Sequence, residues 1–129
     1  MFKTIFRILY WSVFLSIFVK CDSYEFPIAP YPKVVTLQVV GIPGKGVTFQ
    51  GDITHLNDEP IVNHGFVWGL SKYPTIKYGG KIELGSTSTA GVFHADLEAE
   101  LNPDSTYNVR AFISTKTYLF YGENVSFKK

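Results

Sequence analysis

Three histidines, at positions 55, 64 and 94, are the residues most suited to bind a metal ion. A zinc site needs three or four ligands, which often come from short spacings in the chain. His55 falls in a polar loop, His64 at the start of an expected strand and His94 within another, without an H-x-x-x-H or C-x-x-C companion. We therefore expect no metal site and no cofactor, and histidines that face solvent.

Asp96, Glu98 and Glu100 alternate along an expected strand over residues 93–101, so they should share its outer face. Paired carboxylates hydrolyse glycosides when they lie about 5 Å or about 6.5–9.5 Å apart across a cleft. The outer face of a sandwich is convex, so we interpret these carboxylates as a solvated face that discourages pairing at a sheet edge. The G-x-S-x-G, G-x-x-x-x-G-K and G-x-G-x-x-G motifs do not occur. The sequence predicts a protein that is not an enzyme.

Aromatic side chains near the last hairpin are the remaining candidates for a binding site. Phe112 occupies an outward position of its strand, and Tyr118 and Phe120 are out of phase with Tyr121, which we expect to point inward. Exposed aromatic residues near one loop can form a carbohydrate or protein interface. Alternatively, these rings pack together over the hairpin or against the segment that precedes the domain.

Residues 1–20 have the composition of an export signal. Lys3 and Arg7 form a basic start, and residues 8–19 are an apolar run that only Ser12 and Ser16 interrupt. This run is shorter than the roughly 20 apolar residues of a spanning helix. We expect an exported protein.

Cys21 is the only cysteine and directly follows the apolar run, so it has no partner for an internal disulfide. Its placement resembles the acylated cysteine of bacterial lipoproteins, which implies lipid attachment, such as palmitate, and a cell-envelope location, at the outer membrane. Lys20 departs from that motif, which has a small residue before the cysteine. The alternative is cleavage after Ser23, which would discard Cys21 and release a secreted protein.

The rest of the chain is not basic. From Cys21 onward 9 Lys and Arg stand against 11 Asp and Glu, because three of the 12 basic residues precede it. The absence of a basic patch argues against a nucleic-acid partner. A mildly acidic protein is also a poor electrostatic ligand for an anionic membrane, so the expected link to the membrane is the lipid anchor.

A strand over residues 107–113 is the clearest element. Pro103 and Asp104 form a turn, after which Tyr107, Val109, Ala111 and Ile113 share one face and Asn108 and Arg110 the other. A tyrosine near the start of such a strand fits a corner in which its ring is buried and its hydroxyl caps nearby backbone.

Six further strands are expected, spaced about ten residues apart, over residues 33–40, 47–54, 65–70, 76–84, 93–101 and 118–129. Seven short strands with frequent turns predict an all-β fold, an antiparallel β-sandwich. Without a disulfide, packing in the core must stabilise it, and the core residues we expect are Phe49, Trp68, Phe93, Tyr107 and Phe127. Residues 21–32, with three prolines, would form an extended stalk.

Three spaced motifs resemble the fibronectin type III-like domain of surface lipoproteins from Gram-negative anaerobes. They are Leu101-x-Pro103-x-x-Thr106-Tyr107-x-Val109-Arg110-Ala111, Gly65-Phe66-Val67-Trp68 with Pro74-Thr75, and Tyr121-Gly122-Glu123-x-Val125-Ser126-Phe127. The resemblance covers residues 33–128 and implies an immunoglobulin-like sandwich that acts as a spacer and binding module. We therefore expect a non-enzymatic cell-surface lipoprotein for protein–protein adhesion or assembly. The aromatic residues near the last hairpin suggest the alternative, a carbohydrate-binding module that uses Phe112, Tyr118 and Phe120.

Overall fold

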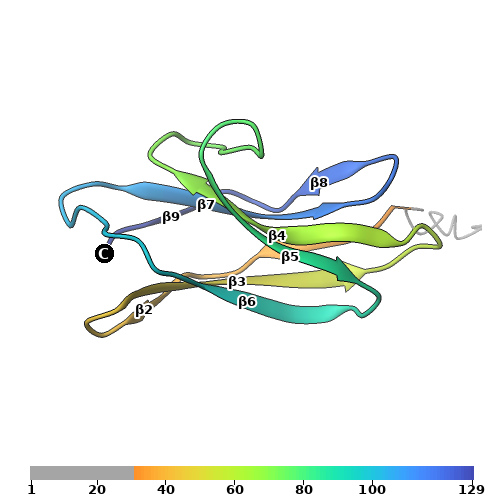
Figure 1. Ribbon diagram of the computed structural model, residues 1–129, viewed down its shortest axis with the longest axis horizontal. Coiled ribbons are helices and arrows are strands. Elements are labelled where there is room, and N and C mark those ends of the chain that lie inside the picture. Colours follow the sequence, from red (N-terminus) through yellow and green to blue (C-terminus); the bar gives the residue numbers. More distant parts are fainter. Residues whose placement is uncertain (1–30) are drawn as a thin grey trace, which may run out of the picture.

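The computed structural model describes residues 31–129 (Figure 1). The expected signal peptide (1–20), Cys21 and the stalk up to residue 30 lie outside the described residues. Nine β-strands are present between residues 31 and 129, and no helix in that range could span a membrane. The strands are β1 (Lys33–Thr36), β2 (Val40–Ile42), β3 (Gly46–His55), β4 (Ile61–Gly69), β5 (Gly80–Thr87), β6 (Gly91–Leu97), β7 (Tyr107–Ser114), β8 (Leu119–Tyr121) and β9 (Val125–Phe127).

The strands form two antiparallel sheets that face each other, as Figure 1 shows. In the first sheet β3 is central, with β1 and β2 along one side and β6 on the other. The second sheet has the order β5-β4-β7, and β8 and β9 both pair with the remaining side of β7. This confirms the all-β, two-sheet architecture expected from the alternating pattern.

The structure has nine strands where the sequence predicts seven. The strand expected over residues 33–40 ends at Thr36, and β2 begins only at Val40 and continues to Ile42, beyond the expected strand. The last expected strand is divided into β8 and β9. At the break between β8 and β9, β1 passes close to Gly122. A Cβ atom on Gly122 would lie 2.4 Å from the Thr36 hydroxyl oxygen, a distance that side chains do not tolerate. The Thr36 hydroxyl also accepts a hydrogen bond from the backbone N–H of Ala111 on β7, which links the two sheets.

The core between the sheets is mainly aromatic. The Phe49 ring lies 5.6 Å from Phe66 and 5.3 Å from Phe127, and Phe127 stacks on Tyr107 at 5.7 Å. Of the five aromatic residues expected in the core, Phe49, Tyr107 and Phe127 are buried, and Trp68 and Phe93 are partly buried against them. Aromatic pairs at such distances add about 0.5–1.5 kcal/mol beyond the burial of their area.

Tyr107 anchors the turn before β7. Its hydroxyl accepts a 2.9 Å hydrogen bond from the backbone N–H of Asn102, five residues earlier. The Asn102 side chain then accepts from the N–H of Asp104, and its carbonyl accepts from the N–H of Ser105. The turn is therefore connected to the core through one buried ring.

Candidate functional site

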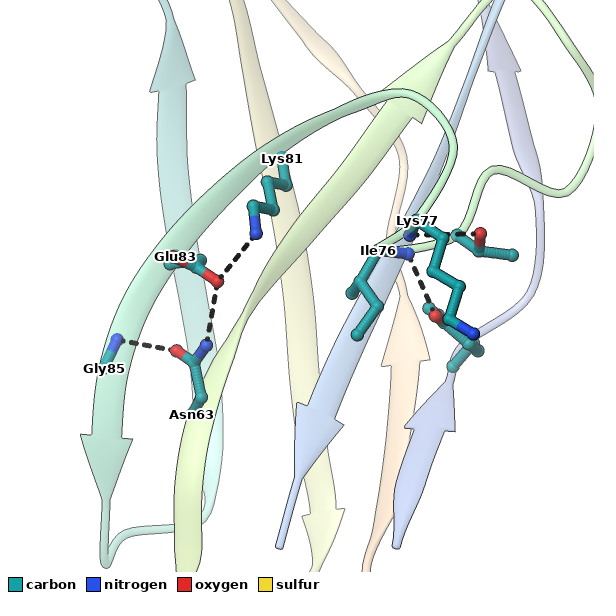
Figure 2. Close-up of polar contacts among 8 residues, drawn as sticks. Asn63, Ile76, Lys77, Lys81, Glu83 and Gly85 are labelled. Carbon is teal, nitrogen blue, oxygen red and sulfur yellow. Dashed lines mark hydrogen bonds and ion pairs between the residues drawn. The ribbon is translucent and has the colours of Figure 1, made fainter.

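The residues between β4 and β5, here called the 70–79 loop, fold back over the outer face of the second sheet. The Tyr121 hydroxyl on β8 accepts a hydrogen bond from the backbone N–H of Ile76, and the Asn124 side chain accepts one from the N–H of Tyr73. Figure 2 shows the backbone nitrogen of Ile76 in this contact, and that of Lys77 in a hydrogen bond within the loop, to the Thr75 hydroxyl. The loop is therefore fixed to strands that lie far from it in the sequence.

The loop is also closed on itself. The backbones of Thr75 and Tyr78 exchange two hydrogen bonds of 3.2 and 3.1 Å, and the Thr75 hydroxyl accepts from the N–H groups of Lys77 and Tyr78. Tyr73 has a φ of 58°, in the left-handed region that costs most residues about 1–2 kcal/mol. The surrounding hydrogen bonds must offset that strain, so the loop has a defined shape.

Asn108 of β7 is the centre of a polar network beneath the loop. It is only 3% exposed, and its amide nitrogen donates to the carbonyl of Leu70. Its amide oxygen accepts from the side chains of Asn124 and Ser126, each at 2.9 Å. Because Asn124 also accepts from the N–H of Tyr73, a single network joins β7, β9 and the loop.

Arg110 lies between two tyrosines on the same face. Its guanidinium carbon is 4.3 Å from the ring centre of Tyr121 and 5.9 Å from that of Tyr73. Its Nε donates to the carbonyl of Gly122 at 3.1 Å. Cation–π contacts at these distances contribute about 0.5–1 kcal/mol at an exposed site. Arg110 therefore contacts the Tyr73 ring, and that residue nevertheless stays exposed.

The surface of the 70–79 loop is apolar and aromatic. Tyr78 is 77% exposed, Tyr73 66% and Leu70 65%, and Ile76 is also exposed. Lone exposed apolar residues are common, but several on one loop of defined shape are typical of an interaction surface. Such a surface can bind a partner with little loss of conformational freedom.

Phe112 is not part of any surface site, and the expectation that it points outward into solvent is wrong. The residue is 1% exposed. The cause is the position of β7 in the middle of its sheet, where Phe112 is flanked by Gly65 on β4 and Tyr121 on β8. The outward face of a central strand is buried here, although the alternating pattern predicted a half-buried strand.

Tyr118 and Phe120 lie together at the opposite end of the domain, with Tyr31. The ring centres of Tyr118 and Phe120 are 5.7 Å apart, and Tyr31 is 5.4 Å from the first and 6.1 Å from the second. The rings are inclined to one another by 37° to 81°, so they pack against each other and offer no flat platform. Tyr31 belongs to the expected stalk, so this arrangement corresponds to packing against the segment before the domain.

His64 also differs from the expectation of a solvent-facing residue. Its side chain is buried, with Nδ1 2.7 Å from the carbonyl oxygen of Gly85 and the ring edge-on to Phe93 at 4.9 Å. His64 pairs with Ile113 of β7 and lies two residues before Phe66, so the alternation of β4 places its side chain on the inner face. Within residues 31–129, no three His, Cys, Asp or Glu side chains are grouped to hold a metal ion.

The acidic side chains do not form one row on a strand. Strand β6 ends at Leu97, so Asp96 lies on it and Glu98 and Glu100 lie in the connection to β7. Pairing ends there because the partner strand β3 begins at Gly46, opposite the end of β6. All three carboxylates are exposed, and Asp96 accepts a 2.7 Å hydrogen bond from the Thr48 hydroxyl.

Polar side chains also brace the edge of the second sheet. Figure 2 shows Asn63 of β4 reaching β5, where its amide oxygen accepts from the N–H of Gly85 and its nitrogen donates to Glu83. Glu83 is also 3.4 Å from the ammonium group of Lys81. These contacts link β5 to β4 at the edge of the second sheet.

Glu59 connects the β3–β4 loop to the β7–β8 turn. A hydrogen bond from the Thr115 hydroxyl, with further hydrogen bonds from Thr117 and the charge of Lys116, holds the pKa of Glu59 below its usual value, although desolvation opposes them. The Thr117 N–H is 2.8 Å from the carboxylate.

Comparison of the whole chain with protein-family models, with curated proteins and with solved structures found no match in any of the three.

Proposed function

We propose that this protein is an exported, non-enzymatic fibronectin type III-like module that binds another protein at the cell surface and is anchored through an acyl chain on Cys21. The strand order supports the domain type. Strand β5 pairs with β4, whereas in a constant-type immunoglobulin domain the corresponding strand joins the opposite sheet. The hydroxyl of Tyr107, bonded to backbone before β7, is the corner that such sandwiches share.

One observation carries the binding function: the 70–79 loop displays exposed tyrosine, leucine and isoleucine side chains on a hydrogen-bonded frame. Tyrosine supplies a large contact area at low cost in conformational entropy, and aliphatic neighbours fit a protein surface. The Tyr31, Tyr118 and Phe120 rings already contact one another. The loop is therefore the surface we assign to a protein partner.

The test is binding of the fluorescently labelled mature protein to cells that produce it. We expect Tyr73→Ser/Tyr78→Ser to lose binding while its melting temperature stays near that of the parent. Tyr31→Ser/Tyr118→Ser is the matched control, because it removes two exposed tyrosines from the other end and should leave binding unchanged. If Tyr31→Ser/Tyr118→Ser loses binding and Tyr73→Ser/Tyr78→Ser keeps it, the binding surface is the cluster of Tyr31, Tyr118 and Phe120, and the proposal is contradicted.

Treatment of the cells identifies the class of ligand. Protease digestion of the cell surface should abolish binding, and periodate oxidation of its sugars should not. Binding that resists protease and is lost on periodate treatment would favour the carbohydrate-binding alternative.

The anchor has a separate test, the intact mass of the protein after expression in a bacterial host. A chain that begins at Cys21 and carries diacyl or triacyl mass supports the anchor. A chain that begins at Tyr24 would mean that the protein is secreted without a lipid anchor.

A further inference from the structure

The 70–79 loop carries positive charge beside its exposed aromatic side chains. Lys72 and Lys77 are both exposed, and the loop contains no acidic residue. Across the part of the chain that the structure describes, the single ion pair joins Lys81 to Glu83. Neither loop lysine therefore has an ionic partner within its own described chain.

A stretch of opposite charge covers the end of β6 and the connection to β7. Residues 96–104, here called the acidic segment, contain no basic residue, and their four carboxylates are exposed: Asp96, Glu98, Glu100 and Asp104. Asp96 accepts a hydrogen bond from a neighbouring hydroxyl, and none of the four forms an ion pair among residues 31–129. The domain thus presents a cationic apolar loop and an anionic segment, and neither neutralises the other.

The loop and the acidic segment lie towards the same end of the molecule. The loop begins after Gly69, which pairs with Asn108 at the start of β7, and the acidic segment ends just before that strand. In Figure 1 the β6–β7 connection lies at the end of the domain away from the orange start of the described chain, and the green loop between β4 and β5 arches over the sheet on the same side of the centre. A two-fold axis that passes between the loop and the acidic segment would place each loop against the acidic segment of a second copy.

We infer that the partner of the 70–79 loop is a second copy of this chain, with the loop of each copy docked on the acidic segment of the other. The two-fold axis repeats the contact, so the dimer contains two identical contacts and is a closed assembly, as most symmetric dimers are. The ends that lead to the N-terminal segments point away from the contact. Copies anchored at Cys21 would then meet from two facing membranes, so the protein would join cells to one another. This inference rests on the proposed function.

The contact is small, since one loop and one short segment from each copy bury less than about 1,200 Å². A pair in solution is therefore weak, and opposite charges give it specificity more than strength. Many copies on two facing surfaces raise the overall binding by roughly 10²–10⁴-fold without any new contact. The contact should therefore be detectable between surfaces that each carry many copies of the protein.

The experiment couples the unacylated mature chain to beads through the thiol of Cys21, which reproduces the orientation of the lipid anchor. We expect parent beads to cluster at 0.1 M salt and to disperse at 1 M, as the screening length falls from about 10 to about 3 Å. Beads with Lys72→Glu/Lys77→Glu should not cluster, and neither should beads with Glu98→Lys/Glu100→Lys. A mixture of these two kinds should cluster again, because their charges are complementary.

Lys33→Glu/Lys116→Glu is the matched control, because it makes the same charge change near the other end of the domain and should leave clustering intact. Parent beads that stay apart, loop-variant beads that cluster as the parent does, or a mixture that stays dispersed would each overturn the inference. Dispersed parent beads, with cell binding that still depends on Tyr73 and Tyr78, would overturn the second copy as partner and leave the proposed function standing. If the parent beads stay dispersed and cell binding does not depend on Tyr73 and Tyr78, both the inference and the proposed function are overturned.

Discussion

The polar network under the 70–79 loop should decide whether the loop keeps its shape. Asn108→Ala removes three hydrogen bonds at once, to the carbonyl of Leu70 and to the side chains of Asn124 and Ser126. Each bond contributes about 0.5–1.5 kcal/mol net. Because the Ser126 and Asn124 groups are not buried and can rebind water, we expect a loss of about 2 kcal/mol in the free energy of unfolding.

That loss corresponds to a fall in melting temperature of roughly 8–16 °C, since 1 kcal/mol shifts a domain of this size by about 4–8 °C. The assay is urea unfolding combined with hydrogen exchange at the backbone amides of Thr75, Ile76 and Tyr78. These amides donate hydrogen bonds within the loop or to Tyr121. They should exchange faster in the variant than in the parent. The amides of the core strand β3 should remain the more protected set in both proteins.

Ser126→Ala is the control, because it removes one of the three bonds and should cost about 0.5–1.5 kcal/mol. In the Asn108→Ala background the same change should cost almost nothing, since its partner is already absent. A loss below about 0.5 kcal/mol for Asn108→Ala, or unchanged exchange at the loop amides, would refute the role given to this network.

Three other predictions follow from single contacts. Tyr107→Phe keeps the ring and leaves the N–H of Asn102 without its acceptor, so unfolding in urea should show a loss of about 1–3 kcal/mol; an unchanged midpoint would mean that the corner contributes nothing. Gly122→Ala places a Cβ against Thr36 backbone and hydroxyl atoms at 2.4–2.7 Å, so it should lower stability by about 1–3 kcal/mol, whereas Gly41→Ala, which meets no atom within 4 Å, should be nearly neutral by the same assay. The folded-state pKa of Glu59 is lowered, so its carboxylate adds stability above pH 4.5, the ordinary value, and that stability is lost as the pH falls through the folded-state value. Glu59→Gln should therefore lie below the parent in melting temperature at pH 7 and approach it in acid; an equal gap at both pH values would contradict this sign.

The expectations from the sequence that agree with the structure concern local patterns. Alternation along residues 47–53 marks Val47, Phe49 and Ile53 as the inner face of β3, and all three are buried. The hydrogen bond from Asn102 to Tyr107 spans only five residues, so one short stretch of sequence contains the pattern that predicts the tyrosine corner. The period of two in a strand, and a turn next to it, can be predicted from neighbouring residues alone.

The candidate site itself depended on contacts between distant parts of the chain. The sequence predicts strands over residues 65–70 and 76–84, whereas β4 ends at Gly69 and β5 begins at Gly80. Only the folded chain shows that the 70–79 loop covers β7, where the carbonyl of Leu70 accepts a hydrogen bond from Asn108, 38 residues later. Phe112 looked exposed because alternation cannot tell a central strand from an edge strand, and that distinction is a matter of which strands pair.

The chain alone therefore determined a two-layer β fold, its aromatic core and its tyrosine corner, since each follows from the order of apolar and polar residues over a few positions. Tertiary structure alone decided that Phe112 is buried and that the 70–79 loop presents an exposed aromatic surface. The physical reason is that burial on the outer face of a sheet depends on which remote segment folds over it, and the local sequence pattern does not contain that information.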